Sequence, residues 1–96
     1  MAQKPETRFQ ERVKRRLIKV PNLWLVKAQM VAIRGIPDIL FCYRGNFFAW
    51  ELKVGDNKAS KLQAWRIQEI RKAGGHARVV TPENFEQAFK EDICSG

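Results

Sequence analysis

Two short apolar runs joined by a glycine turn constrain the fold of this chain more than any other feature. Residues 38–43 and 47–54 each contain an apolar run of strand length, and Arg44-Gly45-Asn46 between them is a turn of the hairpin type. The sequence therefore predicts an antiparallel hairpin. An acidic residue flanks each apolar run, Asp38 before the first and Glu51 after the second. Charged side chains are almost never fully buried unless they are paired or bind a metal, so this placement points to a site.

The hairpin would bring together three charged residues, Asp38, Glu51 and Lys53, that can form a catalytic site. Glu51 and Lys53 are two positions apart, so on a strand their side chains leave from the same face, while Leu52 points the other way into packing. Mg²⁺ favours oxygen ligands, usually one or two carboxylates with water and substrate phosphate, and Asp38 and Glu51 meet that need. The alternative is a solvated Glu51–Lys53 pair on an edge strand, with Asp38 as a turn residue.

At these residues the chain resembles the VRR-NUC family, the virus-type replication-repair nucleases of the PD-(D/E)xK nuclease superfamily. Three segments carry the match, residues 34–38 (Arg-Gly-Ile-Pro-Asp), 51–53 (Glu-Leu-Lys) and 60–63 (Ser-Lys-Leu-Gln). The order of predicted elements and the resemblance both indicate an α/β fold. It would be a restriction-endonuclease-like αβββαβ core, with a mixed four-stranded sheet flanked by helices and a short C-terminal helix.

The resemblance implies a Mg²⁺- or Mn²⁺-dependent endonuclease and assigns the metal ligands. Asp38 and Glu51 would hold the metal, and the backbone carbonyl of Leu52 would complete the protein's ligands. Family members also tend to carry an acidic residue on the first helix. Glu6, three residues before Phe9, matches that position best, and Glu11 is the competing choice.

The resemblance assigns two further residues to the reaction. Lys53 would be the catalytic lysine, and Gln63 would position water or a phosphate from the start of the next helix. That helix is predicted over residues 58–73, with Ser60 as its cap. Its apolar side would carry Leu62, Trp65, Ile70 and Ala73.

The charge of the chain favours a polyanionic partner. The net charge is +8 and the sequence pI is about 10.0, and neutralisation of phosphates with release of counterions drives binding to nucleic acid. A first helix is predicted from Pro5 to about Lys19, with Phe9 among its core residues and a basic stripe beside them. Such a stripe is often only a solvated face. The predicted DNA contacts are Arg8, Arg12, Arg15, Lys19, Arg34, Lys58 and Lys61.

The remaining elements follow from local patterns. Residues 23–29 read as a strand whose Trp24 and Val26 face the core, and 30–36 as a loop leading to the site. Cys42 is predicted to be a small core residue. Residues 76–80 form a further strand, and a final helix begins with Thr81 as cap and Pro82 at its first position. Its packed residues would be Phe85, Ala88, Phe89 and Ile93.

Ninety-six residues form a single VRR-NUC-like domain over residues 1–96, and a domain this small often gains from forming a homodimer. Neither a signal-peptide pattern nor a membrane span is evident, so we expect a cytoplasmic protein of a bacterium or a phage-infected host. We predict a metal-dependent DNA endonuclease that cuts branched DNA such as four-way (Holliday) junctions in replication, recombination or repair. The alternatives are a non-cleaving nucleic-acid-binding protein of the same fold and a sequence-specific restriction-type endonuclease.

Overall fold

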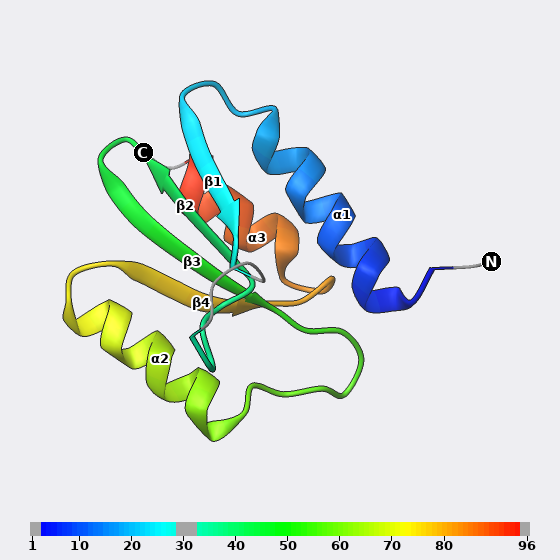
Figure 1. The fold of residues 1–96 in the computed structure, drawn as a ribbon. Helices are drawn as coiled ribbons and strands as arrows, with labels where there is room; N and C mark the ends of the chain where they lie inside the picture. The colour runs from blue at the N-terminus through cyan, green and yellow to red at the C-terminus, as the bar shows by residue number, and fades with distance from the viewer. Residues whose placement is uncertain (1–2, 29–32, 95–96) are drawn as a thin grey trace.

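The computed structural model describes residues 3–28 and 33–94, and it confirms the predicted order of elements (Figure 1). The two α-helices and four strands of the core are followed by a short helix and a π-helical turn. The elements are α1 (Pro5–Ile18), β1 (Leu23–Lys27), β2 (Ile39–Tyr43), β3 (Asn46–Leu52), α2 (Lys61–Lys72), β4 (His76–Val80), α3 (Phe85–Phe89) and η2 (Lys90–Cys94). No helix within the described ranges is long and apolar enough to cross a membrane.

The four strands form one mixed sheet in the order β1-β2-β3-β4. The first two pairings are antiparallel, and β4 lies parallel to β3 after the crossover through α2. Arg44 and Gly45 form the hairpin turn alone, and both have positive φ (53° and 79°), as a tight two-residue turn requires. Asn46, which was predicted to belong to the turn, is instead the first residue of β3 and lies opposite Tyr43.

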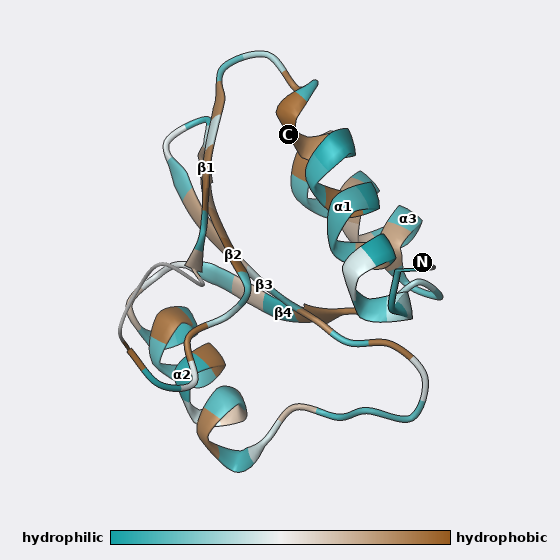
Figure 2. Cartoon of the chain, turned by 45° about the vertical axis from the view of Figure 1, so that its right-hand side comes forward, coloured by the Kyte–Doolittle hydropathy of each residue, from teal (hydrophilic) through white to brown (hydrophobic). Residues whose placement is uncertain are grey.

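Helices cover the two faces of the sheet unequally (Figure 2). The main core lies between the sheet and the layer of α1 and α3, and its fully buried side chains include Val13, Phe41, Trp50 and Phe85. A smaller core lies under α2, where Ile67 packs with residues of β3 and β4. Because side chains alternate along a strand, β3 sends Phe48, Trp50 and Leu52 to the main core and the intervening Ala49 and Glu51 to the α2 side.

The prediction that Trp24 of β1 and Cys42 of β2 face the core was wrong. Trp24 is 68% exposed, and it is Leu23 and Leu25 that pack against the main core. Cys42, which lies opposite Trp24 in the register, is exposed too. A shift of one residue moves a whole strand's side chains to the other face. On that other face α2 packs chiefly on β3 and β4, so these side chains of β1 and β2 stay accessible.

The predicted second helix needs a correction of both its start and its apolar side. It begins at Lys61, because Ser60 caps it, rather than at residue 58. Trp65 is 52% exposed and Leu62 is also exposed, whereas Ile67 is the buried residue of the helix. Ile70 packs beside Ile67 as predicted, so the sheet contacts a stripe of α2 that shares only part of the predicted one.

The C-terminal helix starts later than its sequence indicated. Thr81 and Asn84 close a turn by two reciprocal bonds: the Thr81 N–H donates to Asn84 Oδ1 (2.8 Å) and the Asn84 N–H donates to Thr81 Oγ1 (3.2 Å). The helix α3 then begins at Phe85, so Thr81 is not its cap.

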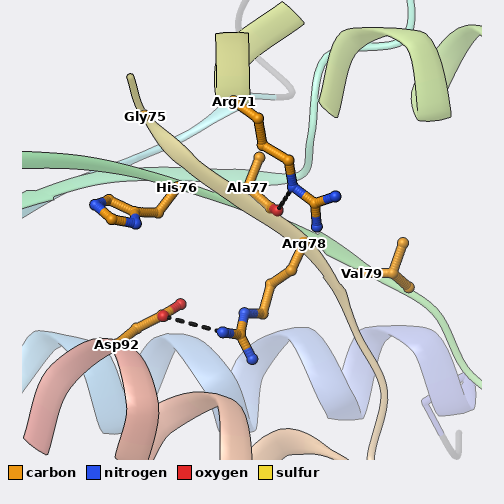
Figure 3. A pocket seen from close by; sticks show the side chains of 7 residues that line it. All are labelled: Arg71, Gly75, His76, Ala77, Arg78, Val79 and Asp92. Atoms are coloured by element: carbon orange, nitrogen blue, oxygen red, sulfur yellow. Dashed lines mark hydrogen bonds and ion pairs between the residues drawn. The ribbon is translucent and has the colours of Figure 1, made fainter. Parts of the chain in front are cut away.

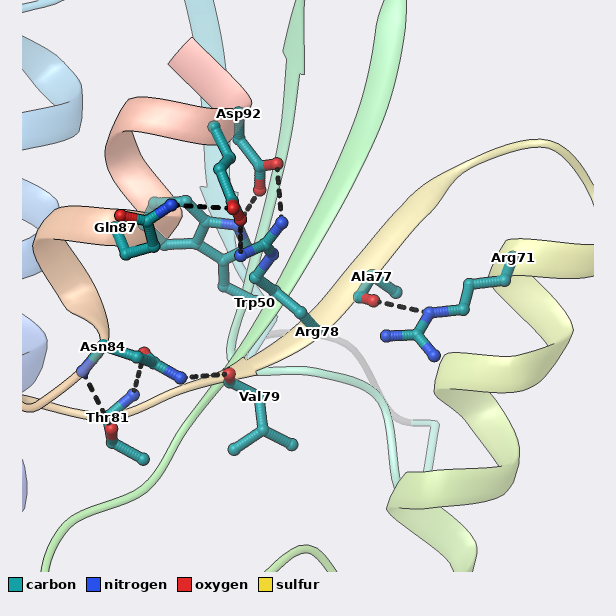
Figure 4. Close-up of polar contacts among 10 residues, drawn as sticks. Trp50, Arg71, Ala77, Arg78, Val79, Thr81, Asn84, Gln87 and Asp92 are labelled. Carbon is teal, nitrogen blue, oxygen red and sulfur yellow. Dashed lines mark hydrogen bonds and ion pairs between the residues drawn. The ribbon is translucent and has the colours of Figure 1, made fainter. Parts of the chain in front are cut away.

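Asp92 connects η2 to strands β3 and β4 of the sheet. Arg78 Nη2 lies 3.3 Å from Asp92 Oδ1 (Figure 3), and Trp50 Nε1 donates to Asp92 Oδ2 at 2.8 Å (Figure 4 draws both residues). The carboxylate therefore satisfies a donor of β4 and the indole of the central strand β3. These bonds hold the C-terminal turn against the main core.

Candidate active site

The two predicted carboxylates come together where β3 extends beyond the start of β2. Glu51 is 2% exposed, the least of any charged residue that the structure describes. Asp38 directly precedes β2, and its Oδ2 accepts a hydrogen bond from the backbone N–H of Leu52 at 2.8 Å. The side chain of Leu52 packs into the main core, as predicted. The strand thus fixes Asp38 through its backbone while it carries Glu51 on the α2 side.

Two further residues contact the carboxylate of Glu51. Lys53 Nζ lies 3.5 Å from Glu51 Oε2, and Gln63 Nε2 donates to the same oxygen at 3.2 Å. Gln63 is also half of a capping box: its Oε1 accepts from the Ser60 N–H (2.8 Å), and its own N–H donates to Ser60 Oγ (3.1 Å). Since the amide oxygen is bonded to Ser60, the amide NH₂ group must face Glu51. The helix start therefore sets which end of Gln63 reaches the site.

Burial and a second carboxyl group make Glu51 hard to ionise. Burial is the larger cause, the charge of Asp38 and a hydrogen bond to it come next, and together they raise the pKa of Glu51 from 4.5 to about 8. Lys53 acts in the opposite sense but does not offset them. Glu51 Oε1 is buried and has no hydrogen-bond partner among the described residues. A shared proton or a cation between the two carboxyl groups would remove this cost.

The donor set fits a hard divalent cation such as Mg²⁺. Carboxylate oxygens come from Asp38 and Glu51, and the Leu52 carbonyl is the third candidate. Ile39 pairs with Trp50, so the same register places Pro37 opposite Leu52. Proline has no N–H, so it cannot bond the Leu52 carbonyl across the ladder. The described part of the chain holds no group of three or more His, Cys, Asp or Glu side chains suited to a metal, so a backbone oxygen and water would complete the ligands.

The structure does not bring an acidic residue of α1 into this set. Glu6 is exposed in the first turn of α1. Glu11 is partly buried and accepts a hydrogen bond from Gln3 Nε2 at 3.0 Å. Neither forms a group of three with the two carboxylates of the site among the residues described. The role of Glu6 remains a prediction.

The loop before Asp38 is fastened to the start of α2. Gly35 has a φ of 77°, and a Cβ at this position would lie 2.5 Å from Cγ of Leu62, so both the conformation and the close packing require glycine. Arg66 Nε donates to the Arg34 carbonyl oxygen at 3.1 Å. Sequence reasoning missed Arg66, because nothing in the spacing shows which helix residue meets a loop. These contacts hold the backbone of Arg34 and Gly35 against α2.

The predicted DNA-contacting residues divide into two groups. Arg12 already has partners within the fold: its Nη2 lies 3.6 Å from Glu86 Oε2, and its Cζ lies 5.1 Å from the centre of the Phe85 ring. Arg16, which was not predicted, makes the shorter bond to Glu86 (2.8 Å). The other predicted residues are exposed, with no acidic partner within the described ranges: Arg8, Arg15, Lys19, Arg34, Lys58 and Lys61.

Comparison with known proteins supports the fold. No protein-family model and no curated protein matches the chain. A solved structure described as a VRR_NUC domain superposes with a TM-score of 0.74 at 24% identity, covering 92% of this chain and 96% of that one. A second, described as a VRR_NUC domain protein, has a TM-score of 0.73 at 19% identity, covering 100% and 93%. The chain has the VRR_NUC fold.

A third similar structure is Hjc, a Holliday junction resolvase from Archaeoglobus fulgidus. Its TM-score is 0.54 at 20% identity, and the alignment covers 78% of this chain and 67% of that one. These likenesses confirm the predicted α/β fold with a mixed four-stranded sheet flanked by helices.

Proposed function

We propose that this chain is a member of the VRR-NUC family and hydrolyses phosphodiester bonds of DNA as a Mg²⁺- or Mn²⁺-dependent endonuclease. One observation carries the proposal. Glu51 is buried beside Asp38 with one oxygen unpartnered among the described residues, and Lys53 Nζ lies 3.5 Å from its other oxygen on a VRR_NUC fold. Burial of a carboxyl group beside a second one destabilises a fold, and a bound cation would offset that cost.

Each residue of the site has a distinct role in this proposal. A bound divalent metal supplies Lewis-acid chemistry and lowers the pKa of a bound water. Asp38 and Glu51 hold the cation, and the Leu52 carbonyl is the backbone ligand. Lys53 donates to the attacking water or to a phosphate oxygen, where negative charge develops. Gln63 keeps the Glu51 carboxylate in one orientation through its bond to Oε2.

Branched DNA is the substrate class that we propose, with a homodimer as the acting form. The similarity to Hjc, a Holliday junction resolvase, supports the substrate. A two-fold dimer would present two sites to two strands of a junction. The accessible apolar row of Trp24, Cys42 and Phe47, which are paired across β1, β2 and β3, supports association with a second copy.

The test is cleavage of linear duplex, single-stranded, flap and four-way-junction DNA with Mg²⁺, Mn²⁺ or EDTA. We expect the wild type to cut the junction best, and Glu51→Gln and Lys53→Met to lose at least about 100-fold in rate, as for other electrostatic catalytic groups. Lys90→Met is the matched charge control, because Lys90 is exposed in η2, and it should retain activity.

Three outcomes would contradict this proposal. Cleavage that survives EDTA or Lys53→Met would exclude the mechanism. Salt-sensitive binding without cleavage of any substrate would favour the non-cleaving alternative. Cutting of linear duplex at one fixed sequence would favour the restriction-type alternative.

A further inference from the structure

The outer edge of β4 borders a cavity of about 360 Å³ that the proposed active site does not use. It lies between Arg71 of α2 and Asp92 of η2, with the backbone of β4 as its floor (Figure 3). β4 is the last strand of the sheet, so its outer backbone groups have no neighbouring strand. An edge of this kind must be protected or must bind something.

The outer carbonyls of β4 are already occupied. The Val80 carbonyl oxygen accepts from the Lys53 N–H (3.0 Å), so Val80 faces β3, and by alternation Ala77 and Val79 face outwards. Arg71 Nε donates to the Ala77 carbonyl oxygen at 2.8 Å, and Asn84 Nδ2 donates to that of Val79 at 3.3 Å (Figure 4).

The outward N–H groups of Ala77 and Val79 remain as donors. Neither has an acceptor within the part of the chain that the structure describes. An incoming β-strand would need acceptors as well as donors, so this edge is closed to strand pairing. It is open to a group that only accepts hydrogen bonds.

Of the two arginines that line the cavity, only one is paired with acidic side chains within the described ranges. Arg78 is neutralised by Glu91 (2.8 Å) and Asp92 (3.3 Å), and the second oxygen of Asp92 accepts from Trp50 (2.8 Å). Arg71 has no acidic partner among the described residues, and its guanidinium extends over the β4 backbone towards the cavity (Figure 3). Its terminal nitrogens are therefore available beside the two outward N–H groups.

The cavity lies one strand away from the proposed catalytic carboxylate. Val79 pairs with Glu51 in the parallel register of β3 and β4, and adjacent strands are about 4.8 Å apart. Arg71 lies near the end of α2, about 12 Å along the helix from Gln63, which donates to Glu51. A DNA strand with its reacting phosphodiester at Glu51 that runs along α2 towards Arg71 would carry a more distant phosphate of the same strand to this edge.

We propose that this cavity binds a phosphate of the DNA strand whose reacting phosphodiester lies at the active site. Arg71 is its cationic ligand, because a planar guanidinium suits phosphate oxygens, and the N–H groups of Ala77 and Val79 are further donors. This inference rests on the proposed function in its choice of DNA as the ligand.

The first experiment measures binding of a labelled four-way junction to the full chain in EDTA, over a range of salt concentrations. Arg71→Gln loses the charge but retains a side-chain N–H that can donate to the Ala77 carbonyl, so this carbonyl of the β4 edge keeps a partner. We expect about tenfold weaker binding, and the slope of log K against log[salt] should shrink by about 0.7 to 0.9. Two control variants separate the loss of this ligand from other effects. Lys72→Gln makes the same change in net charge at the adjacent residue. Asn84→Ala removes the side-chain bond to the Val79 carbonyl of the same edge without a change in charge.

The second experiment follows the backbone amide signals of Ala77 and Val79 by NMR. We expect them to shift when the junction DNA is added, and to stop shifting in Arg71→Gln. A shift with inorganic phosphate as well identifies the phosphate group itself as the ligand, whereas a shift with DNA alone restricts it to the phosphodiester strand.

Two results would overturn the phosphate site. One is an equal loss of binding in Arg71→Gln and Lys72→Gln, and the other is silent amides with both ligands. The binding assay contains EDTA, so its result does not depend on metal-dependent cleavage. Binding that depends on Arg71, together with no cleavage when Mg²⁺ is added, would contradict the proposed function alone. Cleavage without Arg71-dependent binding would contradict this site alone.

Discussion

Glu51→Gln should stabilise the metal-free protein at neutral and alkaline pH, although it removes a proposed catalytic group. The folded-state pKa of Glu51 is raised to about 8 from 4.5. The stability that the protonated group contributes is therefore complete below pH 4.5 and is lost as pH rises towards 8. Each pH unit inside that window changes the free energy of unfolding by about 1.4 kcal/mol. Because glutamine resembles the protonated acid and cannot ionise, the variant should gain up to about 4 kcal/mol over the wild type between pH 5 and pH 9.

The assay is urea unfolding of both proteins in EDTA at intervals from pH 5 to pH 9. Adding Mg²⁺ at pH 8 should restore stability to the wild type alone, by about 2.7 kcal/mol at a hundred times its dissociation constant. Glu86→Gln is the control, because the bond from Arg16 lowers the pKa of Glu86, so its contribution is lost as pH falls. If the gap between wild type and Glu51→Gln stays constant across this range, Glu51 ionises normally and the reasoning is refuted.

Three further substitutions test other features of the structure. Gly35→Ala should lower the free energy of unfolding by at least about 1 to 2 kcal/mol in urea melts, since φ is positive and Leu62 occupies the space of a Cβ. Ser60→Ala should cost about 1 kcal/mol in the same melts through loss of the cap, whereas Ser60→Thr should restore it. Trp24→Ser should convert the proposed homodimer into a monomer in sedimentation velocity without loss of stability, whereas Ile18→Ser, at another exposed apolar side chain, should leave the association unchanged.

The sequence was sufficient to predict the hairpin and the trio because both depend on local rules. Turn chemistry at Arg44 and Gly45 sets the register of β2 and β3, and the two-residue period places Glu51 and Lys53 on one face. The register then brings Asp38 to Leu52. Each step needs only neighbours in sequence or across one turn.

The exposed faces could not be predicted because they depend on what covers the sheet. Residues 23–26 are all apolar, so no alternation shows which side of β1 is buried. α2 likewise has more apolar positions than one face can bury, and packing against the sheet selects Ile67 over Trp65. The choice is made by tertiary contacts, which leave Trp24 without a covering helix.

Glu6 shows the same limit at the site itself. Periodicity places it on α1, but α1 covers the face of the sheet opposite to the α2 side that carries Glu51 (Figure 2). Whether a side chain of α1 can reach the site on the α2 side depends on where the strands of the sheet end. The helical pattern of the sequence gives no information about those strand ends. An acidic position on a helix is therefore weaker evidence for a site than an acidic position on a hairpin.

The site is built where three elements begin or end, and the residues that interrupt regular structure also supply its chemistry. The Asp38 side chain takes the Leu52 N–H, and Pro37, which has no N–H, cannot bond the Leu52 carbonyl opposite it, so that carbonyl is left without that partner. At the start of α2, the cap that satisfies Ser60 also orients Gln63 towards Glu51. A proline or a cap motif beside an acidic strand end can therefore mark a site through the backbone groups that it leaves open or fixes.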